Sequence, residues 1–303
     1  QRQHEHEQPQ PQQHGLLQPP PQQYAIAVQG LSRARSRLTV EFSDGTAAVA
    51  HYSVLPPFPA QIAAVAHHWS EVAWLPRDFP HDPFGRGASV MPYDREDKRR
   101  RLNDGRAYDV GLSDDAGAAN NLGLASSQAF APTASAVARM DEYVQYTLYG
   151  TKEGVPGASA LPPYKSLQLP EPNNGVRLTM YYYCATPPCT AAPHFAYNYT
   201  EQAECGTAGG LNYNWCMTEG IANATYRGFN YPHQIATYYA LYRVARNHPR
   251  IKTRMSWEWY LERSANTTAR LGFARIGYMD GTVTREVLRS VLEENATAAS
   301  APS

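Results

Sequence analysis

The hydrophobic period of this chain changes at the Pro56-Pro57 pair, and this change most constrains the fold. Before the pair, residues 37–42 and 47–54 are rich in β-branched and aromatic side chains with the alternation typical of strands. After the pair, apolar residues recur about every 3.6 positions, beginning with residues 60–73. The chain therefore combines a short β-rich segment with a mainly helical remainder.

Helical spacing of apolar residues predicts about seven helices separated by loops rich in proline and glycine. The predicted helices cover residues 60–73, 115–128, 133–149, 214–226, 232–247, 255–272 and 282–294. Two of the loops, residues 74–114 and 150–213, are much longer than the loops of most compact domains. Long loops of this kind commonly carry function.

The β-rich segment holds three short runs, residues 24–29, 37–42 and 47–54. The last two runs flank Ser43-Asp44-Gly45, which predicts a hairpin turn. Three strands form a poor independent sheet, so the segment is interpreted as the last strands of a β-sandwich. We therefore predict three regions: a disordered Gln/Pro-rich segment at 1–23, the end of a β-sandwich domain at 24–55, and a helical domain at 56–303.

Composition excludes several classes of partner. Lysine and arginine together number 27, as do aspartate and glutamate, so no net charge favours nucleic acid or an anionic membrane. The sequence has no apolar run of about 18 residues or more, and we expect no membrane span. We also expect no cofactor and no metal site.

Cysteines and glycosylation motifs indicate a secreted, extracellular protein. The four cysteines fall in one segment, where two local disulfides are favoured over zinc, because intervals of four and ten residues differ from paired zinc knuckles. The expected pairs are Cys184 with Cys189 and Cys205 with Cys216, chosen because they are local. N-glycosylation motifs begin at Asn198, Asn223, Asn266 and Asn295.

An aspartate-rich segment, residues 103–123, contains the first candidate catalytic groups. Asp114 and Asp115 precede a predicted helix, where neighbouring carboxylates raise each other's pKa and the helix dipole lowers both. Carboxyls with separated pKa values are what acid/base hydrolysis needs, so Asp115 is preferred, with Asp114 and Asp109 as alternates. The alternative is that Ser113 caps the helix and the aspartates complement its dipole.

The second candidate segment is residues 226–234, YRGFNYPHQ, at the start of a long predicted helix. Pro232 suits a first helical turn, which leaves Asn230, Tyr231 and His233 at the mouth of the helix. Ligands often bind at the start of a helix, so these three side chains are candidate ligand-binding groups. The alternative is structural: Asn230 caps the helix, Tyr231 packs, and His233 is a buried, hydrogen-bonded histidine.

Five segments together resemble a family from filamentous fungi that is classed with the six-hairpin glycosidases. They are WLPRDF, DPFGRGASVMPYDRED, DGRAYDVGLSDDAGAANNLG, YRGFNYPHQIATYYALYRVAR and RIGYMDGTVTREVL, and the resemblance covers about residues 24–297. It implies an N-terminal β-sandwich joined to an (α/α)6 toroid, in which six helical hairpins surround a saccharide cleft. The chain holds about half of the twelve helices expected, which makes the predicted toroid partial.

The resemblance implies a glycoside hydrolase that acts on a polysaccharide or oligosaccharide with two carboxylates. Such carboxylates lie about 5 Å apart in retaining enzymes and about 6.5 to 9.5 Å apart in inverting ones. Glu219 is the candidate second group beside the aspartates, and inversion is expected by analogy with the toroid class. The expected sugar-binding residues are Arg106, Asn230, Tyr231 and His233, with Trp69, Trp74 or Trp215 as stacking platforms.

Two other functions use the same residues. A toroid-type polysaccharide lyase would use Tyr231 and His233 for proton transfer, and Asn230 or Arg227 to neutralise a uronate carboxyl. A non-catalytic saccharide-binding protein would use the aromatic cleft without a working carboxylate pair.

Overall fold

The computed structural model describes residues 29, 32, 34–79, 87–102, 117–149, 167–169, 171–178, 182–183, 196–197, 220, 224–271 and 281–300. The chain divides into two compact units, Gln1–Pro56 and Pro57–Ser303. The division falls within the Pro56-Pro57 pair, where the hydrophobic period changes. Each unit is described by itself.

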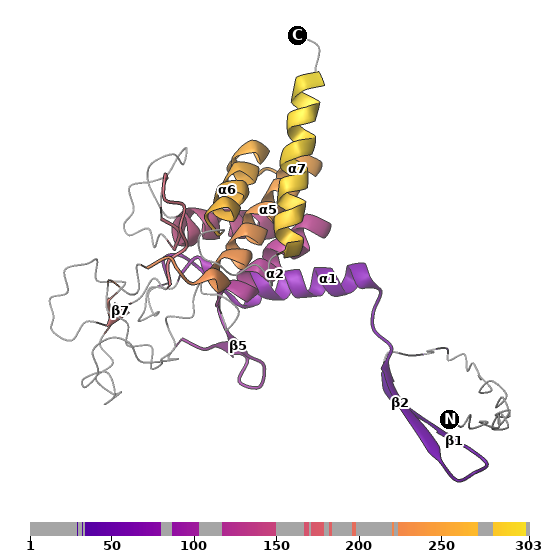
Figure 1. The fold of residues 1–303 in the computed structure, drawn as a ribbon. Helices are drawn as coiled ribbons and strands as arrows, with labels where there is room; N and C mark the ends of the chain where they lie inside the picture. The colour runs from indigo at the N-terminus through magenta and orange to yellow at the C-terminus, as the bar shows by residue number, and fades with distance from the viewer. Residues whose placement is uncertain are drawn as a thin grey trace, which may run out of the picture. The chain divides into compact units, whose positions relative to one another are not determined.

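The first unit contains the predicted hairpin. Strand β1 (Arg35–Glu41) pairs antiparallel with β2 (Ala47–Ser53), as the two-stranded ribbon in Figure 1 shows. Gly45 has φ 83°, and the Asp44 carboxylate accepts hydrogen bonds from the backbone N–H and the hydroxyl of Thr46. A left-handed glycine in a three-residue loop matches the twist of the flanking strands, so the sequence prediction of this turn is confirmed.

The hairpin has little of its surface covered by other described residues. Val49 is 47% exposed and Phe42 is 46% exposed. A two-stranded hairpin is marginally stable by itself, and its apolar face requires cover. The predicted strand at residues 24–29 lies outside the described residues except for Gln29, so the β-sandwich stays a prediction.

The second unit is mainly helical, as predicted. Its helices are α1 (Phe58–His67), α2 (Gly117–Phe130), α3 (Ala134–Tyr143), α5 (Tyr231–Asn247), α6 (Trp257–Leu271) and α7 (Gly281–Ser300). Helices α1 and α3 continue as π-helical turns, His68–Val72 and Val144–Leu148, and a 3-10 turn, Gly228–Asn230, precedes α5. Short strands pair as β3 (Trp74–Leu75) with β4 (Ser89–Val90), β5 (Tyr93–Asp94) with β6 (Arg99–Arg100), and β7 (Tyr182–Tyr183) with β8 (Ala196–Tyr197).

Six of the seven predicted helices correspond to helices of the structure, with shifted ends. The exception is residues 214–226, of which Gly220 is helical and residues 224–226 are not. Most of that segment lies outside the described residues. The predicted long loop 74–114 also contains the β3–β4 and β5–β6 pairs, whose two-residue strands are too short to leave a periodic signal.

The core of the helical unit is built around α5, which packs mainly against α6 and α2 (Figure 1). Several of its largest fully buried side chains are aromatic and carry polar atoms. The Tyr238 hydroxyl donates to Gln168 at 2.7 Å, and the Tyr143 hydroxyl donates to Gln234 at 3.3 Å. These bonds satisfy polar groups that would be costly to bury alone.

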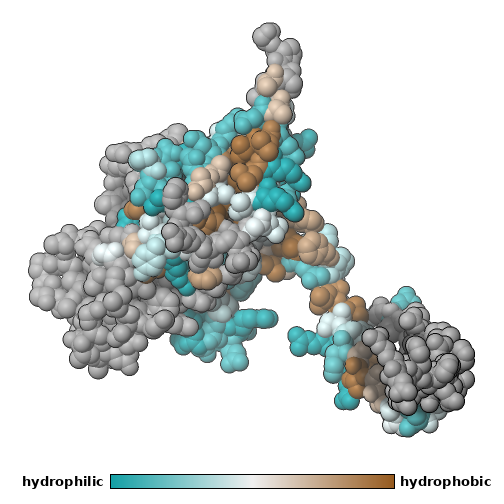
Figure 2. Space-filling model, viewed as in Figure 1, coloured by the Kyte–Doolittle hydropathy of each residue, from teal (hydrophilic) through white to brown (hydrophobic). Residues whose placement is uncertain are grey.

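Helix α7 carries an apolar patch on its outer side, which Figure 2 shows in brown. Leu288 is 52% exposed and Leu292 is 70% exposed, and residues four apart lie on one face of a helix. None of the helices in the described ranges is long and apolar enough to cross a membrane.

Candidate functional site

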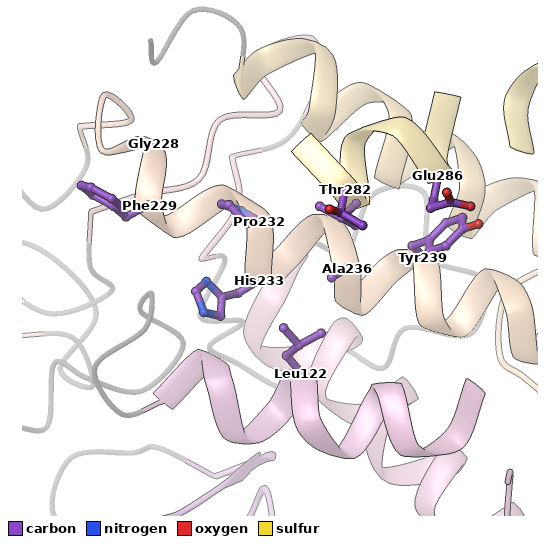
Figure 3. A pocket seen from close by; sticks show the side chains of 10 residues that line it. Leu122, Gly228, Phe229, Pro232, His233, Ala236, Tyr239, Thr282 and Glu286 are labelled. Atoms are coloured by element: carbon purple, nitrogen blue, oxygen red, sulfur yellow. The ribbon is translucent and has the colours of Figure 1, made fainter. Parts of the chain in front are cut away.

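The candidate site is a pocket of about 400 Å³ at the beginning of α5. Three helices and the turn before α5 contribute to its walls (Figure 3). The lining residues are Leu122 from α2; Gly228, Phe229, Pro232, His233, Ala236 and Tyr239 from the turn and α5; and Thr282, Val283 and Glu286 from α7. Most of these side chains are apolar, and His233 and Glu286 supply ionisable groups.

The turn before α5 places Phe229 at this pocket. Pro232 stands in the first turn of α5, where its missing N–H costs no hydrogen bond. The Arg227 guanidinium donates to Asn230 Oδ1 at 2.8 Å and lies 5.8 Å from the centre of the Phe229 ring. Pro232 and the contacts of Arg227 thus stabilise the turn that leads into α5.

Asn230 serves the fold. Its side chain is fully buried, and its Nδ2 donates to the backbone carbonyls of Arg177 and Leu178 at 2.8 and 3.0 Å. Its Oδ1 accepts the bond from Arg227. The predicted role in sugar binding is not supported, because the amide is buried and bonded within the protein. Asn230 does occupy the N-cap position of α5, but its side chain makes no capping hydrogen bond.

Tyr231 and Trp74 are also part of the core. Tyr231 is fully buried, and its hydroxyl donates to the carbonyl of Thr225 at 2.7 Å. Trp74 is 1% exposed, and the Arg139 guanidinium lies 5.7 Å from the centre of its ring. Neither ring is exposed in this structure, so burial does not support the predicted roles of Tyr231 as a sugar ligand and Trp74 as a stacking platform.

His233 is the predicted ligand that the structure does bring to the pocket. It is half-buried, and its imidazole lies between α5 and α2 near Leu122 in Figure 3. The Glu286 carboxylate lies farther along α5, beside the Tyr239 ring. The pocket thus carries an imidazole and a carboxylate at separate places along its walls.

Glu286 was missed by sequence reasoning. It forms ion pairs with Arg285 at 3.3 Å and Arg289 at 2.8 Å, a pattern that in sequence is typical of a solvated helix face. Only the packing of α7 brings it to the pocket. Tyr239 was missed for a similar reason, since α5 contains many tyrosines; its hydroxyl lies 2.9 Å from Ser290 Oγ.

Many predicted residues lie outside the described residues. They are Arg106, Asp109, Asp114, Asp115, Trp215, Glu219, the four cysteines Cys184, Cys189, Cys205 and Cys216, and the glycosylation candidates Asn198 and Asn223. Asp115 stands two positions before Gly117, the first residue of α2. Leu122, which lines the pocket, follows in the second turn of the same helix.

Trp69 packs against α2. A Cβ atom added to Gly123 would lie 2.3 Å from Trp69 Cη2, so the indole ring approaches the α2 backbone where only glycine leaves room. Trp69 remains half-buried. Its ring supports the helix that carries Leu122, which makes it a packing residue beside the pocket wall.

The remaining two glycosylation candidates lie on helices. Asn266 is in α6, and its Nδ2 donates to Glu171 Oε1 at 3.1 Å. Asn295 is an exposed residue of α7. Within the part of the chain that the structure describes, no three His, Cys, Asp or Glu side chains are grouped to hold a metal ion.

The ionisable group with the most altered environment among described carboxyls is Asp141 of α3. Burial raises the pKa of its carboxyl from 3.8 to about 6, although hydrogen bonds from the Tyr260 hydroxyl and the Arg254 N–H oppose the shift. Perturbed carboxyls often mark active sites. Asp141 instead connects α3 to the start of α6 and does not line the pocket.

The fold and site define a mainly helical protein with a largely apolar pocket at a helix start. The chain belongs to a family of unknown function, DUF5695, whose family profile matches residues 12–302. No significant match was found among curated proteins or among solved structures. The match covers most of the chain, but the family has no assigned reaction, so the function is inferred from the residues of the site.

Proposed function

We propose that this protein is a secreted carbohydrate-active enzyme of the glycoside hydrolase type. The observation that carries the proposal is the pocket at the start of α5, whose walls carry His233 and Tyr239 of α5, Phe229 of the preceding turn and Glu286 of α7. A concave, largely apolar site with a few polar groups is the usual form of a small-molecule site.

The reaction requires two carboxyl groups on either side of the glycosidic bond. Glu286 is one carboxylate of the pocket. Asp115 is the preferred second group, with Asp114, Asp109 and Glu219 as alternates. The support is its place in the chain: Asp115 stands two residues before α2, the helix that contributes Leu122 to the pocket wall.

The other pocket residues suit a sugar ring. The Phe229 and Tyr239 rings offer flat apolar faces on which the C–H faces of a pyranose can stack. His233 supplies hydrogen bonds to hydroxyl groups. Apolar walls strengthen such bonds because they exclude competing water.

The proposed architecture is a partial (α/α)6 toroid preceded by the last strands of a β-sandwich. Two helical pairs support it: α2 and α3 are joined by residues 131–133, and α5 and α6 by residues 248–256. Each pair also packs together. Short connections between packed helices produce the hairpins from which such toroids are built.

The burial of two candidate lyase groups supports placing the hydrolase first. The lyase would use Tyr231 for proton transfer, and Tyr231 is fully buried with its hydroxyl bonded to the Thr225 carbonyl. Asn230, one of two candidates for neutralising a uronate carboxyl, is buried as well. For the hydrolase, Asn230 and Tyr231 were expected only to bind sugar hydroxyls, and Glu286 adds a carboxylate to the pocket.

The proposal is tested by incubating the full-length protein with neutral and acidic polysaccharides. Released reducing ends are expected, whereas absorbance from unsaturated products would indicate the lyase. Asp115→Asn and Glu286→Gln should each lower kcat by about a hundredfold or more, the usual scale of acid/base participation. Glu293→Gln is the matched control, since Glu293 is an α7 carboxylate outside the pocket.

Two results would contradict the proposal. One is the absence of reducing ends with every polysaccharide. The other, specific to Asp115, is a near-normal rate with a lowered melting temperature in Asp115→Asn. A carboxylate that only complements the α2 dipole should contribute about 1 kcal/mol or less to stability and nothing to turnover.

A further inference from the structure

A second pocket, of about 390 Å³, lies between the loop at residues 171–174 and the second half of α6. Its lining differs from that of the first pocket. Three carboxamides, one carboxylate and one guanidinium line it, and aromatic rings do not: Glu171, Pro172, Asn173, Asn174, Asn266, Ala269 and Arg270. The pocket uses none of the residues assigned to the first one.

The polar walls are held by contacts behind them. Glu171 forms an ion pair with Arg263, whose side chain is 4% exposed, and accepts a hydrogen bond from Asn266. Asn173 Oδ1 accepts from the N–H of Gly175 at 3.0 Å. These contacts fix the directions of three lining side chains before any ligand arrives, which lowers the entropy cost of binding.

The loop that carries these side chains is fixed to the core by Gln168. Its Nε2 donates to the Asn174 carbonyl at 3.0 Å and to Thr267 Oγ1 at 2.6 Å, and its Oε1 accepts from Tyr238 at 2.7 Å. Gln168 is fully buried. The loop is therefore part of the folded helical unit, and the pocket is a preformed feature.

The lining chemistry points to a neutral, polyhydroxylated ligand. Carboxamides both donate and accept hydrogen bonds, as hydroxyl groups do, whereas an ion would require lining charges of one sign. The charges of Glu171 and Arg270 oppose each other, and Arg263 pairs with Glu171 from behind. We propose that this pocket binds a neutral sugar unit through its hydroxyl groups, as a remote subsite for the saccharide of the proposed hydrolase.

A side-chain contact and a short segment of chain connect the two pockets. Arg270, in the second pocket, donates to Thr225 Oγ1 at 3.5 Å, and Phe229 lines the first pocket. Four residues span at most about 14 Å even when fully extended. The two pockets therefore lie within the length of a saccharide of several units. The inference rests on the proposed function and deepens it, because a remote subsite would select for long neutral chains.

Ala269→Leu tests the subsite directly. Ala269 is an exposed helix residue that lines the pocket, so leucine should fill the pocket with little effect on folding. Ala296→Leu, at an exposed position of α7, is the matched control. Asn173→Asp is a second variant: it keeps the oxygen that accepts from Gly175 and removes the amide donors.

The probes are sulfur-linked hexasaccharides of glucose, xylose and mannose, which resist hydrolysis, and binding is measured by calorimetry. At least one should bind, and Ala269→Leu and Asn173→Asp should each raise its Kd about tenfold, with Ala296→Leu unchanged. Absence of binding by all three, or an unchanged Kd in both pocket variants, overturns the subsite. Sugar binding sensitive to these variants, but without turnover of natural polysaccharides, would overturn only the hydrolase.

Asn266 lines the pocket and begins a glycosylation motif, so a glycan attached to Asn266 could occupy the pocket in place of a substrate. Peptide mass spectrometry of the protein from a eukaryotic host distinguishes the two. An unmodified Asn266 is expected. A glycan on Asn266 in most molecules would overturn the inference, since it would occupy the pocket wall from which substrate must bind.

Discussion

The two pockets of the helical unit are bounded by different chemistry and are supported in different ways. The pocket at the start of α5 is lined largely by apolar side chains such as Leu122 and Val283, which helix packing alone positions. The pocket on α6 is lined by polar side chains that depend on buried partners such as Arg263 and Gln168. Loss of a buried partner leaves a polar group unsatisfied, which costs more than a small change in packing.

The difference predicts where the molecule is sensitive. Substitutions of the buried residues that support the polar pocket should disturb ion pairs and hydrogen bonds in α6 and in the loop at residues 171–174. Changes beside the apolar pocket should act through volume alone, and changes on the outer face of α7 should act hardly at all.

The largest effect is expected at Asp141, which holds the start of α6. Well below pH 3.8 its carboxyl is protonated in both the folded and unfolded states and contributes nothing to the pH dependence. As pH rises past 3.8 the unfolded state ionises more readily than the folded state, and stability is lost until the folded pKa of about 6 is passed. The shift corresponds to about 3 kcal/mol.

Asp141→Asn removes this titration. The free energy of unfolding of the wild type, minus that of the variant, should therefore fall by about 3 kcal/mol between about pH 2.5 and about pH 7.5. Denaturant titrations at several pH values measure it, and the difference cancels other titrating groups. A pH-independent difference would show that Asp141 has an ordinary pKa.

The second effect concerns Arg263, behind the polar pocket. Arg263→Met keeps most of the buried volume but removes the ion pair with Glu171 and the cation placed 5.8 Å from the ring centres of both Tyr149 and Trp259. Removing one partner of a buried pair costs about 3–5 kcal/mol, and Glu171 is 48% exposed, so we expect roughly 2 kcal/mol.

The measurement combines denaturation with hydrogen exchange. Amides of residues 171–178 should lose protection in Arg263→Met, while those of α2 keep it. Arg285→Met, at an arginine whose side chain is 75% exposed, is the control and should change stability by less than about 0.5 kcal/mol. If the amides of α2 lost as much protection from hydrogen exchange as those of residues 171–178, the two pockets would not be supported independently.

A smaller effect is expected beside the apolar pocket. The added methyl group of Gly123→Ala would lie 2.3 Å from the Trp69 ring, and such overpacking costs about 1–3 kcal/mol. Better helix propensity returns up to about 1 kcal/mol, so a net loss of roughly 1–2 kcal/mol is expected. Thermal melting measures the loss, and Trp69→Leu in the same chain should restore part of it. A variant more stable than the wild type would contradict the close approach.

The smallest effect is expected on the outer face of α7. Leu288→Gln together with Leu292→Gln replaces exposed apolar side chains, so stability should change by less than about 0.5 kcal/mol. Binding of an apolar dye should decrease, because the patch in Figure 2 is reduced. A loss of stability above about 1 kcal/mol would mean that another surface covers these leucines in the folded protein.

Local pattern was sufficient for most of the secondary structure. The stripe of Val137, Met140, Val144 and Leu148 predicted a buried helix face, and all four side chains are at most 4% exposed. The hairpin at Gly45 was predicted from its turn residues. These features depend on neighbours within a few positions, which is the range over which helical spacing and turn preferences act.

The site depended on contacts that sequence does not show. Asn230 and Tyr231 have the side chains of sugar ligands, but the same atoms satisfy carbonyls of Arg177, Leu178 and Thr225, up to 53 residues away. Glu286 resembles a solvated charge in sequence and reaches the pocket through the packing of α7.

The sequence by itself determined where the long helices and the hairpin form and which segment begins α5. Tertiary structure alone decided which polar side chains at the start of α5 line a pocket and which form hydrogen bonds inside the core. The physical reason is that a hydrogen-bonding group serves a ligand or a buried backbone equally well, and only the partner that folding places beside it distinguishes the two roles.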